Sequence, residues 1–512
     1  MTVIPKIYDS GENAKTKKHP KTKNNGMKIK LMRRLLFGLV LVISTTALPA
    51  TSPNIVFILA DDLGWADLKC YGSSFHETPY IDQLARDGLK FTSFYTAGSV
   101  CSPTRASILT GKYPVRTGIT DWIPGQNVTG REFVQLRPQR ELAREEFTLA
   151  EAFKEAGYQT IYIGKWHLGG KNMQPTDQGF DRYVGDGDDD EQGGRKDAAK
   201  LKRRLESTEQ FTRASIQFLK ERDPEKPFLL YLSYHDVHTP IQPMPGLVEL
   251  YDKKAKALAG ETPEKPEHAG HTRMRQDNPA YASMVAAVDQ SVGQVRGALG
   301  KMGLAGNTIV IFTSDNGGLS TAKKIGPTCN SPLRAGKGWL YEGGIRVPLI
   351  VVAPGVTKPG SSVDVPFISN DFYPTLLELA SLPSRPRQHL DGVSFAETLR
   401  GKSSGEGRPL LWHYPHYHGS TWTPGAAIRD GDWKLVEFFE ADRIELYNLR
   451  DDPGEMNNLA NTMPKKANDL RIQLAKWRAE IGAKMPEKST DFSPSKNPAK
   501  SDKSKRANRA ER

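Results

Sequence analysis

The sequence predicts an α/β protein in which helices sandwich a large, mostly parallel β-sheet. Short apolar runs recur along the chain, and helical spacing of apolar residues lies between them, for example over 148–157 and 283–303. An unbroken apolar run is typical of a strand buried on both faces, and strands that alternate with helices favour a parallel sheet. The runs are NIVFILADDLGW (54–65), YQTIYIG (158–164), PFLLYLSY (227–234), TIVIFTS (308–314) and VPLIVVAP (347–354).

The composition of the chain changes at SLPSRPRQ (381–388), a segment typical of a domain boundary. We expect the main α/β domain to occupy residues 52–385. The shorter, more aromatic segments that follow predict a smaller α+β subdomain over 386–483, with an antiparallel sheet and a helix at 464–480. Residues 484–512 are rich in Lys, Ser, Pro and Asn, which predicts a basic, disordered tail.

Residues 1–50 are predicted to be an N-terminal extension and a secretory signal peptide. The segment KIKLMRRLLFGLVLVISTTALPA (28–50) has a basic flank, an apolar stretch and small residues at its end. The apolar stretch is shorter than the ~20 residues of a membrane-spanning helix, so we expect no stable membrane span after cleavage. Translation starts at Met1 or at Met27, and either start predicts an exported protein, periplasmic or secreted, from a bacterial host.

The chain carries a formal net charge of +12, but the charge is concentrated at its two ends. Residues 1–34 hold ten Lys or Arg and two Asp or Glu, and residues 484–512 hold nine and four, which leaves a net charge of −1 for everything between. A nucleic-acid-binding domain carries its basic excess on the folded surface. The distribution therefore argues against nucleic acid as a partner.

The three cysteines are odd in number and cannot form a complete disulfide framework. Cys70 and Cys329 are either a disulfide or two buried thiols, and the sequence favours neither. Cys101 stands in SVCSPTRASILTG (99–111), where Pro103 fits the first turn of a helix that begins at the thiol. Because the free N–H groups of a helix N-terminus attract anions, we expect Cys101 where an anionic substrate would bind.

Polar side chains follow four of the predicted strands directly, which predicts a functional site at one edge of the sheet. Ligands of open α/β sheets bind beyond the carboxyl ends of the strands. Carboxylate and amide oxygens suit Ca²⁺ or Mg²⁺ better than zinc. The candidate metal ligands are Asp61, Asp62, Asp315 and Asn316. The basic groups that indicate an anion, and the imidazoles that accompany them, are Arg105, Lys165, Lys337, His167, His235 and His238.

The segment CSPTR (101–105) resembles the C-x-P-x-R signature of the sulfatases, and ASILTGKYPVRTG, which continues it, resembles the extended signature. The signature alone is a weak pattern, but an ordered set of segments accompanies it between about residues 53 and 460. These segments are NIVFILADDLGW, GKWHLGG, HTP, SDNGG, GKGWLYEGGIRVP and IRDGDWKL…LYNLRDDPGE. The resemblance implies an alkaline-phosphatase-like fold and a formylglycine-dependent sulfuric ester hydrolase of the arylsulfatase or carbohydrate sulfatase kind.

The resemblance implies that the Cys101 thiol is a precursor. In this family the signature cysteine is oxidised after translation to Cα-formylglycine (3-oxoalanine) by a formylglycine-generating or sulfatase-maturating enzyme, and the aldehyde is hydrated to a gem-diol. One diol oxygen attacks the sulfate ester, and deprotonation of the other hydroxyl expels sulfate and restores the aldehyde. The residue derived from Cys101 would thereby also contact the metal.

The resemblance assigns the metal site residue by residue. The divalent cation, Ca²⁺ with Mg²⁺ as the alternative, would polarise the attacking oxygen and one sulfate oxygen. Arg105 would hold the formylglycine and support the metal site. The cation would be bound by Asp61, Asp62, Asp315 and Asn316.

The resemblance also assigns the groups that handle the sulfate and the protons. Lys165, His238 and Lys337 would bind the sulfate and stabilise its developing charge. His238, together with Lys337, would protonate the leaving alcohol, and His167 would take the proton from the sulfated diol.

The stretch WHYPHYHG (412–419) resembles segments of bacterial carbohydrate sulfatases. Aromatic faces stack on sugar rings and histidines donate to hydroxyls or carboxylates, so His235 and His413 are expected to contact the substrate. Packing within the protein is the alternative for both. The expected substrate is a sulfated small molecule or glycan, more a carbohydrate ester than a simple phenol.

Two other functions fit the same residues. One is a phosphoester or phosphonate hydrolase, because phosphate and sulfate have similar size and shape. The other is a sulfated-glycan-binding protein in which Cys101 is never oxidised, although every expected catalytic position is retained in the sequence.

Overall fold

The computed structural model describes residues 52–185, 198–402, 407–490 and 492. The predicted signal peptide, residues 186–197 and most of the predicted C-terminal tail lie outside the described residues. Within the described part of the chain, no helix has the length and apolar character needed to cross a membrane.

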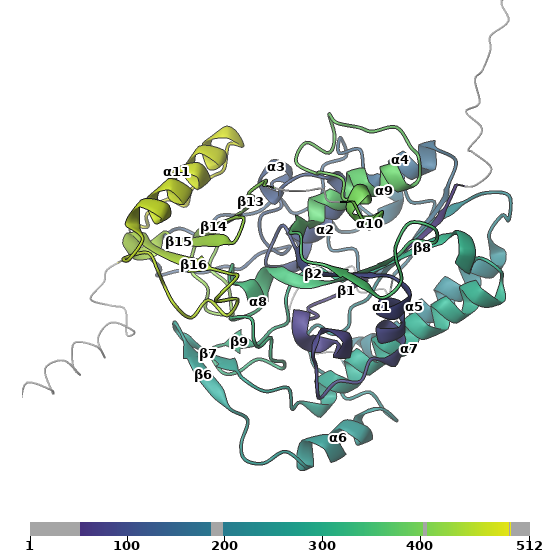
Figure 1. The fold of residues 1–512 in the computed structure, drawn as a ribbon, viewed down its shortest axis with the longest axis horizontal. Coiled ribbons are helices and arrows are strands. Elements are labelled where there is room, and N and C mark those ends of the chain that lie inside the picture. Colours follow the sequence, from purple (N-terminus) through teal and green to yellow (C-terminus); the bar gives the residue numbers. More distant parts are fainter. Residues whose placement is uncertain (1–51, 186–197, 403–406, 491, 493–512) are drawn as a thin grey trace, which may run out of the picture. The chain divides into compact units, whose positions relative to one another are not determined.

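A nine-stranded, mostly parallel sheet forms the centre of the protein (Figure 1). Its strand order is β11-β2-β10-β8-β1-β5-β3-β4, with β12 paired to β2. β10 runs antiparallel to both of its neighbours, whereas the other paired strands are parallel. The strands are β1 (Asn54–Ala60), β2 (Leu89–Tyr95), β3 (Gln159–Gly164), β4 (Arg182–Val184), β5 (Phe228–Ser233), β8 (Thr308–Ser314), β10 (Arg346–Val352), β11 (Ser361–Val363) and β12 (Phe367–Ile368).

The central strand β1 shows why the sequence contains unbroken apolar runs. Ile55, Phe57 and Leu59 belong to the core on one face of the sheet, and Val56 and Ile58 belong to the core on the other. Successive side chains of a strand point to opposite faces, so a strand covered on both sides must be apolar throughout. The predicted α/β fold is confirmed at this strand.

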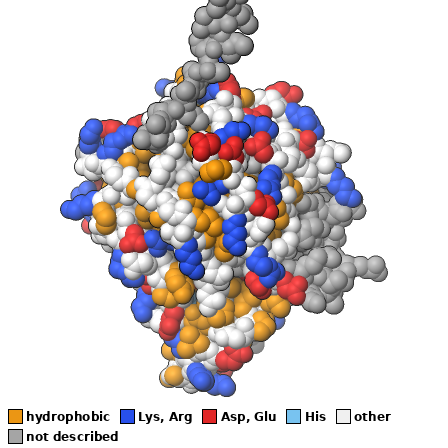
Figure 2. All heavy atoms as spheres, turned by 90° about the vertical axis from the view of Figure 1, so that its right-hand side faces the viewer, with side chains coloured by type: hydrophobic (Ala, Val, Ile, Leu, Met, Phe, Trp, Pro, Cys, Tyr) orange, Lys and Arg blue, Asp and Glu red, His pale blue; other side chains and the backbone are white. Residues whose placement is uncertain are grey.

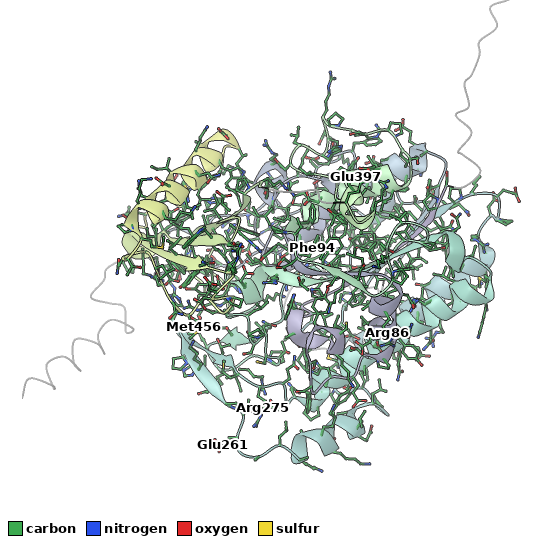
Figure 3. The ribbon with its side chains drawn as sticks, viewed as in Figure 1. Arg86, Phe94, Glu261, Arg275, Glu397 and Met456 are labelled. Atoms are coloured by element: carbon green, nitrogen blue, oxygen red, sulfur yellow. The ribbon has the colours of Figure 1, made fainter. Side chains whose placement is uncertain are left out.

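Helices cover both faces of the sheet, as Figure 1 shows. α2, α4, α9 and α10 contribute to the core on one face, and α1, α5 and α7 to the core on the other. Phe94 of β2 lies in the interior (Figure 3), where its ring is 5.0 Å from that of Phe372 on α9. The helices are α1 (Pro79–Asp87), α2 (Cys101–Thr110), α3 (Pro114–Thr117), α4 (Leu149–Glu155), α5 (Ala198–Glu221), α6 (Val248–Lys256), α7 (Pro279–Lys301), α8 (Glu342–Ile345), α9 (Phe372–Leu379), α10 (Ala396–Leu399) and α11 (Pro464–Glu480).

The C-terminal part forms a second, antiparallel sheet, as the sequence predicts. One face of this sheet packs on aromatic residues of the main body, including Trp339 and Tyr341, and the other packs on α11. Its strands are β13 (Leu410–Tyr414), β14 (Gly425–Asp430), β15 (Trp433–Phe438) and β16 (Arg443–Asn448). A third, small sheet is formed by β6 (Glu264–Glu267), β7 (Gly270–Arg273) and β9 (Thr321–Ala322).

Residues 487–489, which composition assigns to the tail, are attached to the main body. Val134 donates its backbone N–H to the carbonyl of Glu487 at 2.8 Å, and Ser489 donates to the carbonyl of Glu132 at 2.8 Å. The chain beyond α11 therefore returns to the main body before it leaves the described residues.

Cys70, Cys101 and Cys329 are all free thiols in the structure. Of the two alternatives for Cys70 and Cys329, the structure shows unpaired thiols rather than a disulfide. Figure 2 shows one face of the molecule, on which Lys and Arg are interspersed with Asp and Glu among the described residues.

Candidate active site

Cys101 is the first residue of helix α2, as the proline placement predicts. Its side chain is buried, with Sγ 3.5 Å from Asp61 Oδ1 and 3.6 Å from Lys337 Nζ. Burial and the neighbouring Asp61 raise the pKa of the thiol to about 12, so the encoded cysteine is protonated near neutral pH. An unmodified Cys101 is therefore a poor nucleophile in these surroundings.

The carboxyl ends of β1 and β8 bring four oxygen-bearing side chains together. Ala60 and Ser314 are register partners at the ends of these parallel strands, so the residues that follow them emerge side by side. The Asp62 backbone N–H donates to Asp315 Oδ1 at 3.2 Å, and Asn316 Nδ2 donates to Asp62 Oδ1 at 2.8 Å. The predicted metal ligands Asp61, Asp62, Asp315 and Asn316 are all buried in this cluster.

Three cations neutralise the three carboxylates. Lys165 Nζ lies 2.5 Å from Asp61 Oδ2, and Lys337 Nζ lies 2.7 Å from Asp62 Oδ1. Arg105 donates from Nε and Nη2 to Asp315 Oδ2 at 2.9 and 2.7 Å. The six side chains are thus interlocked and formally neutral as a set.

Burial and the neighbouring charges shift the pKa values of the three carboxyl groups in different directions. Burial opposes ionisation of Asp61, but Lys165, His238 and Arg105 together hold its pKa well below the usual value. Burial raises the pKa of Asp62, and it raises that of Asp315 to about 7 with the help of the Asp61 charge. A divalent cation between these carboxylates would favour their ionised forms.

The cluster fits a hard divalent cation. The candidate ligand atoms of Asp61, Asp62, Cys101 and His238 lie within 4.8 Å of one another. Asn316 adds an amide oxygen, Oδ1, which is buried and has no hydrogen-bond partner among the described residues. Oxygen donors in this number suit Ca²⁺ or Mg²⁺.

Two candidate histidines, His167 and His238, each donate a ring N–H to a backbone carbonyl, which can only accept hydrogen bonds. His238 donates from Nδ1 to the Thr239 carbonyl at 2.6 Å, which leaves Nε2 facing Asp62 Oδ2 at 3.7 Å. His167 donates from Nε2 to the Ile123 carbonyl at 2.7 Å, which leaves the lone pair on Nδ1.

The two remaining predicted residues are placed differently. His235 is buried beside α5, with its ring 6.0 Å from that of Phe211. His413 lies on β13 with Nε2 bonded to the Lys484 carbonyl at 2.9 Å, and its ring is 5.8 Å from that of Phe439.

His413 is not brought to the cluster because strand residues alternate between faces. Trp412 and Tyr414 point into the core against the main body, whereas Leu411 lies on the α11 face. His413 shares that α11 face, and its contact with the substrate stays a prediction.

Sequence reasoning missed several supporting residues. Ser233 ends β5 and accepts a 2.6 Å hydrogen bond from Arg105 Nη1, and the Tyr162 hydroxyl donates to the Lys165 carbonyl at 2.6 Å. Ser102 accepts the Ile123 N–H through Oγ at 3.1 Å, which anchors the loop that orients His167. A hydroxyl at the end of an otherwise apolar strand, as at Ser233, was the available signal.

Known proteins resemble this chain over most of its length. A sequence model of the sulfatase family matches residues 53–382, and a model named for the C-terminal region of N-sulphoglucosamine sulphohydrolase matches residues 335–480. A sulfatase of Formosa agariphila is 34% identical, over 88% of this chain and 95% of that protein. Arylsulfatase A of Homo sapiens is 32% identical, over 87% and 91%.

A solved structure shares the fold. Ps i-CgsB in complex with k-i-k-neocarrahexaose is 28% identical, with a TM-score of 0.68 over 85% of this chain and 95% of that one. The sheet, its helices and the charged cluster define a hydrolase of the alkaline-phosphatase-like class. Within that class, the family model matches more than half of the chain, and the chain therefore belongs to the sulfatase family of sulfuric ester hydrolases.

Proposed function

We propose that this sulfatase removes sulfate from a carbohydrate, using Cα-formylglycine formed from Cys101 and a Ca²⁺ ion. The observation that carries the proposal is the position of Cys101 Sγ, between an Asp61 carboxylate at 3.5 Å and the Lys337 ammonium at 3.6 Å. The carbohydrate class is supported by a relative named N-acetylgalactosamine-6-sulfatase of Sus scrofa, which is 32% identical over 75% of this chain.

The metal ligands would be Asp61, Asp62, Asp315 and Asn316. A bound divalent cation supplies Lewis-acid polarisation of the sulfate ester, and the hydrated formylglycine supplies the attacking oxygen. Arg105 holds Asp315 in place and, through Nη1, donates to the Lys165 carbonyl at 2.7 Å, so it ties the metal side of the site to the anion side.

Lys165 and Lys337 bind the sulfate. The Lys337 ammonium lies 3.6 Å from Cys101 Sγ and the Lys165 ammonium 2.5 Å from Asp61 Oδ2, and the three carboxylates balance these lysines together with Arg105. A divalent cation would give this neutral set a surplus positive charge, which complements an anionic ester and the charge that develops in its transition state.

The two histidines would take part in different proton transfers. His167 donates from Nε2 to the Ile123 carbonyl, so in the neutral imidazole the lone pair is on Nδ1, which would take the proton from the modified residue 101. His238 directs Nε2 toward the cluster, and in its protonated form it would give that proton to the leaving alcohol.

The predicted signal peptide and the oxidation of Cys101 also have consequences for where the protein acts and which enzyme modifies it. We infer export to the periplasm or medium, and a formylglycine-generating or sulfatase-maturating enzyme as a partner during synthesis. Mature material would be distinguished by an N-terminus at residue 48 or 51, after cleavage behind Ala47 or Ala50.

Turnover of p-nitrophenyl sulfate and p-nitrophenyl phosphate by the same preparation tests the reaction, and N-acetylgalactosamine 6-sulfate and related sulfated sugars test the substrate class. We expect a large preference for sulfate and release of inorganic sulfate from at least one sugar. A preference for phosphate would support a phosphoester hydrolase instead. Binding without turnover of any ester by material oxidised at Cys101 would contradict the proposal.

A further inference from the structure

His418, which belongs to the histidine-rich stretch 412–419, lies beside the segment of the anion-binding Lys337. Gly338, which follows Lys337, has a φ of +81°, and a Cβ atom there would lie 2.0 Å from His418 Nδ1. The imidazole therefore occupies the space above a glycine next to the residue whose ammonium touches Cys101 Sγ.

The loop that carries His418 is fixed on both sides. Trp339 Nε1 donates to the Ser420 carbonyl at 2.9 Å, and Gly338 donates its N–H to the Ser99 carbonyl at 2.7 Å. The first bond holds the loop to the Lys337 segment, and the second holds that segment to the turn before Cys101. His418 therefore has a defined position relative to the reacting residue.

Hydrogen bonds select one tautomer of His418. The Ser420 backbone N–H donates to Nδ1 at 3.2 Å, which requires a lone pair on Nδ1. The imidazole stays neutral because burial and the nearby Lys337 lower its pKa to about 3. The proton is therefore on Nε2, for which the structure shows no hydrogen-bond partner among the described residues, and His418 as a whole residue is partly exposed.

We propose that His418 contacts the substrate and donates its Nε2–H to an oxygen of the sugar next to the sulfate. This inference rests on the proposed function, because it names the part of a carbohydrate ester that the site recognises. A neutral donor beside Lys337 suits a hydroxyl or ring oxygen, whereas the ammonium group suits the sulfate itself.

Two substitutions separate this role from a structural one. His418→Asn keeps an acceptor near the position of Nδ1 for the Ser420 N–H but loses the distal donor. His418→Gln keeps a donor near the position of Nε2 but loses the loop contact. His271→Gln is the matched control, because that imidazole lies on β7 with Nδ1 3.1 Å from Glu264 Oε1.

We expect His418→Asn to lower kcat/KM for the best sulfated sugar about three- to tenfold, mainly through KM. The same variant should stay within about twofold of wild type on p-nitrophenyl sulfate, which lacks the sugar hydroxyls. His418→Gln should lose less than His418→Asn on the sugar, and His271→Gln should match wild type on both substrates.

Equal losses on both substrates, or a larger loss on the sugar for His418→Gln than for His418→Asn, would overturn the role of His418 while leaving sulfate hydrolysis intact. Failure of the proposed function would appear differently, as a wild-type protein without turnover of any sulfated sugar. If either variant does not fold, a crystal structure of the wild-type protein with the same sugar decides: Nε2 within hydrogen-bond distance of a sugar oxygen supports the proposal, and Nε2 facing only solvent overturns it.

Discussion

At the scale of single residues, the site depends on the balance of buried charges. Each carboxylate of Asp61, Asp62 and Asp315 has its own cation, and removal of one partner leaves the other charged, buried and unpaired. A broken buried pair of this kind costs about 3–5 kcal/mol. Substitutions in the cluster must therefore be read with a stability measurement beside the activity.

Replacement of Cys101 by Ala removes only a side chain that reacts. We expect turnover of p-nitrophenyl sulfate to fall at least about 1,000-fold, because the nucleophile is lost. The melting temperature should change little, since the sulfur makes only long contacts, at 3.5 and 3.6 Å. A steady-state assay of purified, folded variant checks this, and substantial residual turnover would remove Cys101 from the mechanism.

Replacement of Asp315 by Asn keeps the shape of the side chain and removes a negative charge from the metal site. Wild-type protein should gain several degrees in melting temperature when Ca²⁺ is added to chelator-treated material, because a ligand that binds only the folded state stabilises it. The variant should gain much less. Thermal melts at a series of Ca²⁺ concentrations test this without relying on activity, and an undiminished Ca²⁺ shift would mean that the cation binds elsewhere.

Asp121, which lies outside the metal cluster, is expected to make the stability of the protein depend on pH. Burial raises the pKa of this carboxyl to about 7, although it accepts hydrogen bonds from Tyr414 Oη and the Trp122 N–H. The folded state therefore holds a proton that the unfolded chain loses near pH 4, so the Asp121 contribution to stability falls as pH rises from about 4 to 7.

Asp121→Asn is expected to remove that contribution. Relative to wild type, the variant should gain stability as pH rises from 5 to 7, by up to about 1.4 kcal/mol per pH unit, and the difference should level off above pH 7. Urea unfolding of both proteins at several pH values provides the comparison. Parallel pH profiles for the two proteins would show that Asp121 ionises normally.

At the scale of elements, the C-terminal sheet is attached to the active-site segment by a buried charge network. Lys434 of β15 lies 2.9 Å from Glu342 of α8 and 2.8 Å from Glu455, and all three side chains are fully buried. Glu455 also accepts the Glu342 backbone N–H at 2.7 Å. α8 closes the segment that begins at Lys337, so this network helps to hold an anion-binding group in place.

Lys434→Met should leave Glu455 buried without its cation and Glu342 with only the more distant Arg346, 3.4 Å away. We expect the free energy of unfolding to fall by about 3–5 kcal/mol. Lys465→Met is the control, because the Lys465 side chain is 91% exposed and its ion pair with Asp469 should contribute less than about 1 kcal/mol. Similar small losses for both variants in chemical denaturation would contradict the role given to the network.

At the scale of the whole molecule, the sequence was sufficient for the sheet, and it predicted that the candidate metal ligands lie together at one edge of it. Apolar runs identify strands that are buried on both faces, and the polar residues after them meet because parallel strands end at one edge. His413 could not be placed in this way, since strand polarity does not say which face of an antiparallel sheet meets the main body. The attachment of residues 487–489 to the main body could not be predicted either, because it uses backbone hydrogen bonds, which composition does not indicate.

The most direct test of the account is mass spectrometry of the peptide that contains residues 99–105, from active protein made in its own host. The account predicts a mass lower than that of the encoded peptide by the difference between a thiol and an aldehyde side chain, and a fraction of converted peptide that rises in step with specific activity. Full sulfatase activity in material that still carries the Cys101 thiol would contradict it.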